Sequence, residues 1–407
     1  MDHPVSTAPV FDEPGITQPL AEALGEAEAL IRTAANITTE ADLLEGYSYL
    51  AGRIRGAVQG VFSHDPGRTT FINATHQFSR QGLDNPDALY FQATLKPGET
   101  YVVRGRRGTT ADLSFQVMSG QYTAERNPTP LAAFDERAIT FAPDGTYALT
   151  FGPELPPGVE APADYVVIGD TANSLIVREV YNDWDREERG TMWIECPAEL
   201  GRPAPVLTRE QLAKKYAFAA RALTGTIRTW FVFPDLFQNK VPVNTLSTPQ
   251  STPGGLTSQR SSVGHYELED DEALVVTVPE CVECTYQGFQ IGSDWYLSTD
   301  YETHQTSLTK AQALTDPDGR MRFVIAHGNP GVANWLETLG HRTGSIMLRW
   351  QQLSRDLGPE DQPVVERIRL ADLPQVLPFY EQNQVSPAQY ADRIAARQRS
   401  VARRMLS

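Results

Sequence analysis

The sequence predicts a mainly β protein with helical additions, built from two antiparallel β-sandwich domains, the second of them jelly-roll-like. Short runs rich in β-branched and aromatic residues recur between Gly- and Pro-containing turns, and strands do not alternate regularly with long helices. Length is the third observation. Because 407 residues are too many for one hydrophobic core, we expect two domains.

Residues 15–65 are expected to form an N-terminal helical segment. Thr39 and Asp42 have the spacing of a capping box, which predicts a helix start, although Asp is a weaker partner there than Glu. Apolar residues then recur every three or four positions, as on one face of a helix. They are Leu43, Tyr47, Leu50, Ile54, Val58 and Val61.

Seven strand-like runs indicate the first β-sandwich domain, over residues 67–200. Each run is rich in β-branched or aromatic residues and is bounded by turn signals. The runs are ALYFQATL, ETYVVRGR, ADLSFQVM, TYALTF, YVVIG, SLIVREVY and TMWIEC. This number of runs at this spacing is typical of an antiparallel sandwich.

A connecting helix is predicted over residues 207–237, with Thr208 and Gln211 as its capping box. Residues 244–264 are rich in Ser, Thr, Gly and Pro, which favours a flexible segment, either a linker or an ordered lid. Five further strand-like runs indicate the second, jelly-roll-like sandwich domain over residues 265–372. These runs are EALVVTV, TYQGFQIG, MRFVIAH, SIMLRW and VVERIRL.

A basic helix is expected over residues 386–407, with Ser386 as its N-cap and Pro387 at its first position. This segment holds five arginines and one acidic residue, on a chain whose formal net charge is −16. Docking onto its own chain, or onto a neighbouring subunit of a homo-oligomer, would explain the arginines. A separate anionic ligand is the alternative.

Composition and charge exclude several classes of protein. A hydrophobic content of 41% is an ordinary globular value, and the negative charge argues against nucleic acid as a partner. The first 25 residues lack the basic start and apolar run of a secretory signal, and no stretch approaches eighteen apolar residues. We therefore expect no membrane partner and a cytoplasmic location. Phosphate-loop, dinucleotide-binding, nucleophile-elbow and zinc-protease motifs are absent from the sequence, and no cofactor is expected.

Three cysteines are too few for a disulfide framework. Cys281 and Cys284 have the two-residue gap of a zinc knuckle, but only Cys196 is left to complete a second pair. A buried cysteine also serves as a small hydrophobic residue. A metal-dependent enzyme that uses this pair with a histidine stays open as an alternative.

Polar and aromatic side chains gather in residues 85–90, 178–185, 294–304 and 327–341, which we expect to line one cleft between the sandwiches. Aromatic rings mixed with carboxylates and amides are typical of sites for a polar, hydroxyl-rich small molecule such as a carbohydrate. The candidate substrate-binding residues are Asn85, Tyr90, Arg178, Trp295, His304, His327, Asn334 and Trp335.

A hydrolase of glycoside-like substrates would need two carboxylates beside the scissile bond. The candidate catalytic residues are Asp183, Asp87, Asp300, Glu302 and His341. Of the two histidines at 327 and 341, either one beside Glu302 or Asp300 could act as a general acid or base.

Structural roles compete with these functions. Asn85 and Asp87 are suited to capping a turn through hydrogen bonds to the backbone. Strand alternation places either Arg178 or Glu179 inward, and a buried arginine would need a partner such as Asp87 or Asp183. A non-catalytic structural or oligomerisation module is therefore the second functional hypothesis.

Five segments resemble a pair of bacterial domain families of unknown function, numbered 1254 and 1214, that commonly occur in one polypeptide. Residues 85–90 read NPDALY and resemble the Asn-x-Asp-Thr-x-Tyr motif of the first family, with Ala88 in place of Thr. IVREVYNDWD is similar to the same family's Arg-x-Tyr-x-x-x-Asp neighbourhood. ECTYQGFQIGSDW, TSL and NPGVANWLETLGHRTGSIMLRW resemble the second family, with matches at Asn334, Trp335, Leu336, Thr338 and Gly340.

The resemblance spans residues 70–200 for the first family and 265–355 for the second. It implies two β-sandwiches, the second jelly-roll-like, with helical additions. It implies no reaction and no catalytic residues, so function has to be inferred from the site.

Overall fold

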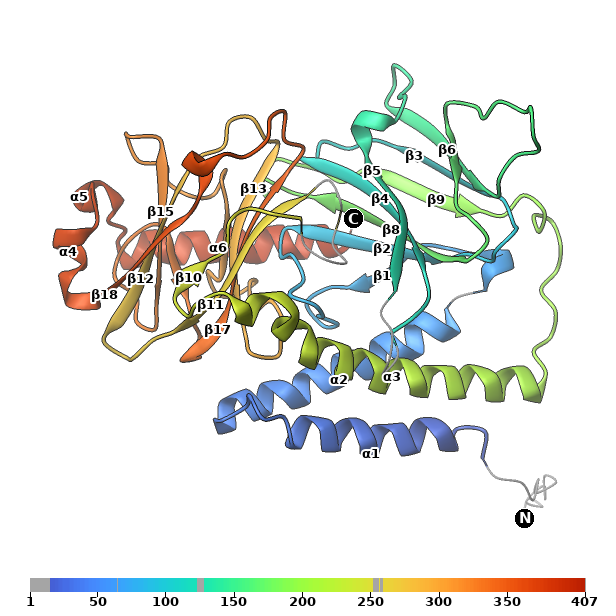
Figure 1. Cartoon of the computed structure of the whole chain (residues 1–407), viewed down its shortest axis with the longest axis horizontal. Helices are drawn as coiled ribbons and strands as arrows, with labels where there is room; N and C mark the ends of the chain where they lie inside the picture. Colours follow the sequence, from blue (N-terminus) through green and yellow to red (C-terminus); the bar gives the residue numbers. More distant parts are fainter. Residues whose placement is uncertain (1–14, 64, 123–127, 252–255, 257–258, 407) are drawn as a thin grey trace, which may run out of the picture.

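The computed structural model describes residues 15–406 apart from 64, 123–127, 252–255 and 257–258. Two β-sandwiches lie side by side, with a layer of helices along one of them (Figure 1). The expected mainly β fold with two sandwiches and helical additions is confirmed.

The first sandwich packs a five-stranded sheet against a four-stranded sheet. The five-stranded sheet has the order β1 (Ile72–Thr75), β2 (Ala88–Thr94), β8 (Ala172–Val180), β4 (Asp112–Ser119) and β5 (Thr129–Asp135). The other has the order β7 (Tyr165–Val167), β6 (Thr146–Gly152), β3 (Tyr101–Arg106) and β9 (Thr191–Glu195). Phe115, Phe151, Leu175 and Val177 are fully buried in the core between them.

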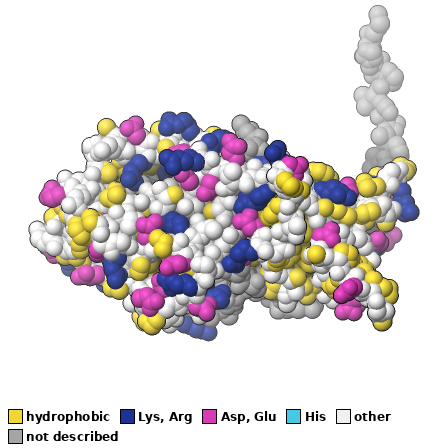
Figure 2. Space-filling view, turned by 90° about the horizontal axis from the view of Figure 1, so that it is seen from above, with side chains coloured by type: hydrophobic (Ala, Val, Ile, Leu, Met, Phe, Trp, Pro, Cys, Tyr) yellow, Lys and Arg dark blue, Asp and Glu magenta, His cyan; other side chains and the backbone are white. Residues whose placement is uncertain are grey.

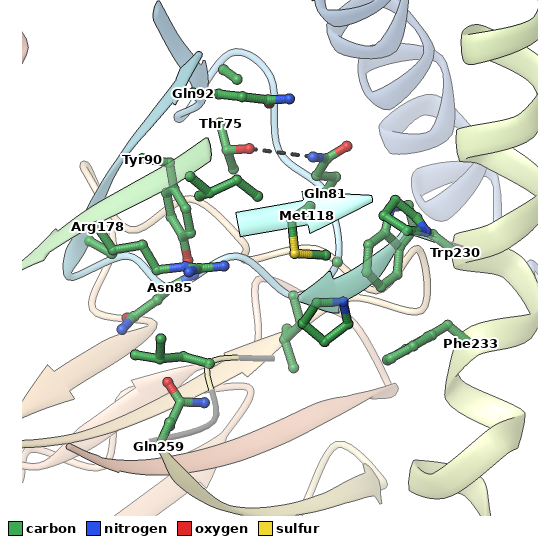
Figure 3. Close-up of a pocket in the computed structure, with 18 of the residues that line it drawn as sticks. Thr75, Gln81, Asn85, Tyr90, Gln92, Met118, Arg178, Trp230, Phe233 and Gln259 are labelled. Atoms are coloured by element: carbon green, nitrogen blue, oxygen red, sulfur yellow. Dashed lines mark hydrogen bonds between the residues drawn. The ribbon is translucent and has the colours of Figure 1, made fainter. Parts of the chain in front are cut away.

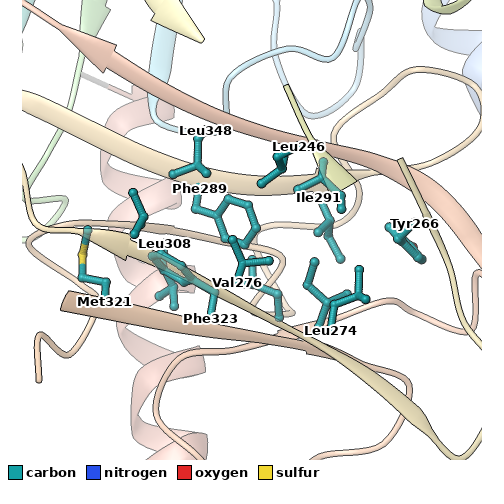
Figure 4. Packing of buried hydrophobic residues seen from close by; sticks show 14 of the residues in the cluster. Leu246, Tyr266, Leu274, Val276, Phe289, Ile291, Leu308, Met321, Phe323 and Leu348 are labelled. Atoms are coloured by element: carbon teal, nitrogen blue, oxygen red, sulfur yellow. The ribbon is translucent and has the colours of Figure 1, made fainter. Parts of the chain in front are cut away.

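The second sandwich has the same pairing of a five-stranded with a four-stranded sheet. The first has the order β10 (Thr245–Leu246), β11 (Arg260–Glu267), β17 (Thr343–Gln351), β13 (Tyr286–Gly292) and β14 (Ser307–Thr309). The second has the order β16 (Trp335–Glu337), β15 (Arg320–Ala326), β12 (Glu272–Pro279) and β18 (Val364–Arg369). Phe289 and Phe323 meet in its core with ring centroids 4.6 Å apart (Figure 4).

Strand pairing is antiparallel in both sandwiches except at two edges. There, β7 runs parallel to β6 and β16 runs parallel to β15. The predicted Ser/Thr/Gly/Pro segment contributes to the second sandwich, because Thr245 pairs with His265 and β11 begins at Arg260. Its residues 252–255 and 257–258 lie outside the described residues.

Three long helices form the layer beside the first sandwich. They are α1 (Gln18–Arg32), α2 (Glu40–Phe62) and α3 (Arg209–Phe237). The Thr39 side chain accepts a hydrogen bond from the Asp42 amide at the start of α2, as the capping box predicted. Ala27, Ile31, Leu223 and Ile227 are buried where the helices pack together.

The remaining helices are short or lie at the C-terminus. They are α4 (Leu373–Val376), α5 (Tyr380–Asn383), α6 (Pro387–Leu406), η1 (Pro66–Arg68), η2 (Glu136–Ala138), η3 (Gln238–Lys240), η4 (Pro359–Asp361) and η5 (Leu370–Asp372). In Figure 1, α6 runs from the second sandwich towards the first. Within the described part of the chain, no helix is long and apolar enough to cross a membrane.

Candidate functional site

A cavity of about 420 Å³ lies where the first sandwich, α3 and the second sandwich meet (Figure 3). Strands β2 and β8 supply Tyr90 and Arg178, helix α3 supplies Trp230 and Phe233, and β17 supplies Arg349. Sites of this kind, concave and placed between domains, are where small molecules commonly bind.

Strand alternation explains which side chains reach this cavity. On β8, Leu175 and Val177 point into the sandwich core, so Ile176 and Arg178 point out of the opposite face. Tyr90 of β2 lies directly across from Arg178 in the antiparallel ladder, so the two share that face.

A second cavity, of about 550 Å³, adjoins the first and extends between α2, α3 and the same face of the sheet. The two cavities are neighbours, because several residues line both. The shared residues are Ala74, Gln81, Gln92, Met118, Tyr122, Pro128 and Ile176.

Arg178 has no carboxylate partner within the described part of the chain. Its Nη1 atom is buried and has no hydrogen-bond partner, and its guanidinium carbon lies 5.8 Å from the centre of the Tyr90 ring. Figure 3 shows the side chain extending beside Tyr90 towards Asn85. Burial lowers the pKa of Arg178 from its ordinary value, because charge is costly away from water. The predicted pairing with Asp87 or Asp183 is therefore wrong.

Two further arginines on the cavity walls are buried and donate to neutral groups. Arg53 donates to Ser79 Oγ at 2.8 Å and to Gln81, while its Nε has no partner. Arg349 donates to the Leu83 carbonyl at 2.6 Å and to Gln290. Arg53 is 5% exposed and Arg349 is 6% exposed.

The described lining residues of the two cavities include no aspartate or glutamate. Lys214 and Lys215 also line the second cavity, and Lys214 is paired with Glu210, which lies outside the lining, at 2.6 Å. The chain as a whole is acidic, and Figure 2 shows basic and acidic side chains interspersed over the face in view. The positive lining is thus a local property of the cavities.

Neutral polar groups complete the lining. Amide side chains come from Gln81, Asn85, Gln92, Gln259 and Gln351. Such groups can donate and accept hydrogen bonds from the same side chain, which suits hydroxyl or carboxylate groups of a ligand.

The rim of the first cavity contains backbone in the left-handed region. Leu83 has φ 46° and Tyr296 has φ 57°, and the Leu83 amide donates to the Tyr296 carbonyl at 2.6 Å. Gly82 has φ +66°, and a Cβ atom there would lie 2.6 Å from the Trp230 ring. Non-glycine residues in this conformation carry strain, which often accompanies functional sites.

Asp87 lies in a separate buried network between the sandwiches. Its carboxylate accepts hydrogen bonds from Trp184 Nε1 at 2.9 Å and from the Tyr286 hydroxyl at 2.7 Å. Burial raises the pKa of Asp87, opposed by the Tyr286 hydrogen bond and the positive charges of Arg404 and Arg397. Asn85 caps the turn as predicted, because its Oδ1 accepts from the Asp87 amide at 3.0 Å, whereas the Asp87 carboxylate bonds side chains and not the backbone.

The other predicted carboxylates do not meet at one site. Asp183 Oδ1 accepts from the Asp185 and Arg186 amides at 3.0 and 3.2 Å, beside α6. Asp300 Oδ1 accepts from the amides of Glu302 and Thr303 at 2.9 and 3.0 Å, which closes a turn. Asp183, Asp300 and Glu302 do not line either cavity.

The three candidate histidines are likewise apart. His304 Nδ1 lies 2.8 Å from Glu337, and His327 Nδ1 lies 2.6 Å from the Thr338 hydroxyl. His341 Nδ1 lies 2.7 Å from Asp42 of α2. The structure therefore does not place His327 and His341 on a shared partner.

The remaining predicted residues pack within the fold. Trp295 is buried against the helical layer and donates to the Asp42 carbonyl at 2.7 Å. Asn334 exchanges hydrogen bonds with the backbone of Leu314, both at 2.7 Å. Trp335 donates to the Ala326 carbonyl at 3.0 Å, so this corner is sealed by its own contacts.

Of the residues predicted from sequence, the structure brings Asn85, Tyr90 and Arg178 to the cavity. Sequence reasoning missed Arg53, Arg349 and Trp230. Arg53 and Trp230 are polar or aromatic residues on long helices, where solvent exposure or core packing is the ordinary expectation. Gly56 and Gly60 could have indicated the cavity from the sequence, because residues without side chains leave space on one side of α2.

The cysteines do not form a metal cluster. Cys196, Cys281 and Cys284 are free and buried, and no group of three or more metal-ligating side chains occurs among the described residues. Lys310 Nζ donates to the Cys281 carbonyl at 3.0 Å and lies 3.8 Å from Cys284 Sγ. The charged neighbours of this pair are thus Lys310 and Glu283, and no described histidine forms a metal-ligating group with it.

The fold and the cavity together define a mainly β, two-sandwich protein with a positively charged internal site. No family model matches the chain, and no curated protein matches it. A crystal structure of an uncharacterised protein from Burkholderia cenocepacia is similar over 88% of this chain and all of that chain, at 27% identity and a TM-score of 0.76.

A structure of a protein from Vibrio parahaemolyticus is similar over 79% of this chain and 98% of that chain, at 14% identity. Its TM-score of 0.42 is too low to support an argument. The similarity to the Burkholderia protein therefore supports the two-sandwich architecture of this chain. The names of the Burkholderia and Vibrio proteins state no activity.

Proposed function

We propose that this protein binds a small anionic molecule, with Arg178 in contact with the negative group. The observation that carries the proposal is a set of three arginines, of which Arg53 and Arg349 are buried and Arg178 is half-buried with a buried Nη1 atom, and none of them has a carboxylate hydrogen-bond partner among the described residues. A buried charge is costly unless it is paired, so a bound anion would offset a cost that the protein alone leaves in place.

A carboxylate is the simplest anion that suits these groups. Its two oxygens can take the free Nη1 donor of Arg178 together with amide donors from residues such as Gln259. Trp230 and Phe233 would cover an apolar part of the ligand, as aromatic side chains do in most small-molecule sites.

A neutral, hydroxyl-rich ligand is the second candidate, because five amide side chains line the first cavity. Glycoside hydrolysis is not supported in the same way. The reaction needs two carboxylates beside the scissile bond, and the described lining has none. The proposal is therefore one of binding.

We also propose that the chain belongs to families 1254 and 1214, that its domain boundaries are those expected from the sequence, and that it is cytoplasmic. The free cysteines support the last of these, since disulfides are rare in reducing compartments.

Isothermal titration with a panel of small carboxylates and their matching neutral amides tests the proposal. We expect at least one carboxylate to bind more tightly than its amide. Arg178→Met should remove that preference, with a loss of roughly 10- to 100-fold for the carboxylate, because a hydrogen bond to a charged group contributes about 1.5–3 kcal/mol.

Arg104→Met is the matched control, since Arg104 is an exposed arginine on β3, in the sheet that does not line the cavities, and pairs with Glu195 of β9. It should leave binding unchanged. Equal affinities for every acid and its amide, unaltered by Arg178→Met, would overturn the proposal. Tighter binding of neutral sugars than of any acid would favour the second candidate.

A further inference from the structure

The second cavity, like the first, has both polar and apolar walls, which come from α2, α3 and the cavity face of β1, β2, β4 and β8. Its apolar side chains are Ala57, Val61, Ala74, Met118, Pro128, Ile176, Phe218 and Ala222. Because the two cavities adjoin and share seven lining residues, a ligand bound at Arg178 can extend towards the second cavity.

Glycines in α2 make room for such a ligand. A Cβ atom at Gly60 would meet nothing within 4 Å, and one at Gly56 would meet only the ends of side chains, from 3.2 Å outwards. Each glycine in a helix interior lowers helix stability by roughly 0.5–1 kcal/mol relative to alanine. The open side of α2 is therefore maintained against helix propensity.

Arg53 points independently to a ligand in this second cavity. It lines the cavity, is 5% exposed, and its Nε atom has no hydrogen-bond partner. Burial lowers its pKa from the ordinary value. A polar atom left buried without a partner is uncommon in proteins.

The outer end of the second cavity reaches the surface. Lys214, Gly120 and Gln121 line it and are exposed. Lys215 is held beside them, with its ammonium donating to the Val61 carbonyl at 2.9 Å. Lys214 is paired with Glu210 at 2.6 Å, so the opening combines lysine ammonium groups with one carboxylate.

We propose that the ligand is an amphipathic monocarboxylate, whose head group contacts Arg178 and whose apolar chain lies in the second cavity between α2 and α3. This inference rests on the proposed function and adds the chemical class of the ligand. The path runs from the Lys214 opening inward, past Arg53, to Arg178.

Chain length provides the test. In titrations of the full chain, dodecanoate should bind at least tenfold more tightly than hexanoate, because each buried methylene adds favourable transfer free energy. Dodecanol, which has the chain without the charge, should bind more weakly than dodecanoate.

Gly60→Phe should fill the second cavity without a backbone clash. We expect it to weaken dodecanoate at least tenfold and to leave hexanoate within twofold of the wild-type affinity. Gly25→Phe is the control, because Gly25 is also a helix glycine with nothing within 4 Å but lies on α1, away from both cavities. The melting temperature of each variant reports whether it has folded.

The outcomes separate this inference from the proposed function. If Arg178→Met weakens hexanoate while dodecanoate gains nothing from its length, or Gly60→Phe leaves dodecanoate unaffected, the inference fails and the anion site stands. If hexanoate and dodecanoate bind no better than their neutral analogues and Arg178→Met changes nothing, both fail.

Discussion

The hydroxyl of Tyr286 in the second sandwich donates a 2.7 Å hydrogen bond to Oδ2 of Asp87 in the first. Asn85 also contacts that hydroxyl through its Nδ2, at 3.0 Å. This buried contact fixes the corner that carries Asn85, and the neighbouring Tyr90 hydroxyl accepts from the Asn85 amide at 2.9 Å. The interface between the sandwiches therefore positions part of the cavity wall.

Tyr286→Phe is expected to lower the free energy of unfolding by about 1–3 kcal/mol, because it leaves Asp87 Oδ2 buried without this donor. Urea denaturation provides the measurement. Tyr216→Phe is the control, since Tyr216 packs on Phe62 through its ring at 4.9 Å, and its loss of a hydroxyl should have little effect. Equal effects of the two substitutions would contradict a specific role for the Asp87 contact.

Arg397 of α6 makes a second connection that can be tested. It donates to the Tyr301 carbonyl, the Ser307 carbonyl and the Ser307 hydroxyl, at 2.9, 2.9 and 3.0 Å. Arg397→Ala should destabilise the protein by about 2 kcal/mol or more, because three buried acceptors lose their donor. Arg399→Ala on the same helix, at an exposed position, should change stability by less than about 0.5 kcal/mol. The basic helix thus docks onto its own chain, as one of the two sequence hypotheses held.

Asp112 predicts a specific pH dependence of stability. Burial raises its pKa to about 6, and its Oδ1 accepts from Gln352 at 2.6 Å. The folded protein therefore holds this proton more tightly than the unfolded chain, whose aspartates titrate near 3.9. The free energy of unfolding therefore falls as the pH rises from about 4 to about 6. Above that range Asp112 is ionised in both states, and the free energy falls no further on its account.

Asp112→Asn keeps the oxygen that faces Gln352 and removes the ionisation. Relative to the wild type, it should be stabilising at pH 8 by roughly 2–3 kcal/mol at most, and close to neutral at pH 4. Urea titrations at both pH values measure this, with Asp164→Asn, at an exposed position, as the background. A difference that does not vary with pH would show that Asp112 ionises normally.

Gly82→Ala tests how closely α3 packs at the cavity rim. The residue has φ +66°, and a Cβ atom would lie 2.6 Å from the Trp230 ring. We expect a loss of about 2–4 kcal/mol, from backbone strain and displacement of the ring. Gly98→Ala is the control, because Gly98 has φ +81° with open space around it and so reports backbone strain alone. Equal losses of stability in Gly82→Ala and Gly98→Ala would show that the Trp230 ring moves aside at little energetic cost.

The sequence predicted the strongly patterned strands and missed the short or irregular ones. β12 and β17 are rich in Val, Ile, Leu and Met and were recognised directly. β5 includes Pro130, which argues against a strand, and β14 spans only three residues. β11 begins with Arg-Ser-Ser, which reads as a loop until its partner β17 is known.

The site was predicted only where a local pattern is unusual. Arg178 stood out because a charged residue within an apolar strand must face something particular. Its predicted carboxylate partners were wrong, because β8 turns that face towards the cavity while Asp87 points to Tyr286 and Trp184. Arg349 reaches the first cavity from β17 and Arg53 reaches the adjoining second cavity from α2, and no local pattern encodes such a distant convergence.

The anion site itself is tested most directly by a crystal structure of the protein soaked with 4-bromobenzoate. The bromine gives an anomalous signal that locates the ligand without ambiguity. Our account predicts the signal inside the cavity near Trp230, with the carboxylate about 3 Å from the Arg178 guanidinium. Bromine sites confined to the outer surface, or a carboxylate turned away from all three arginines, would contradict it.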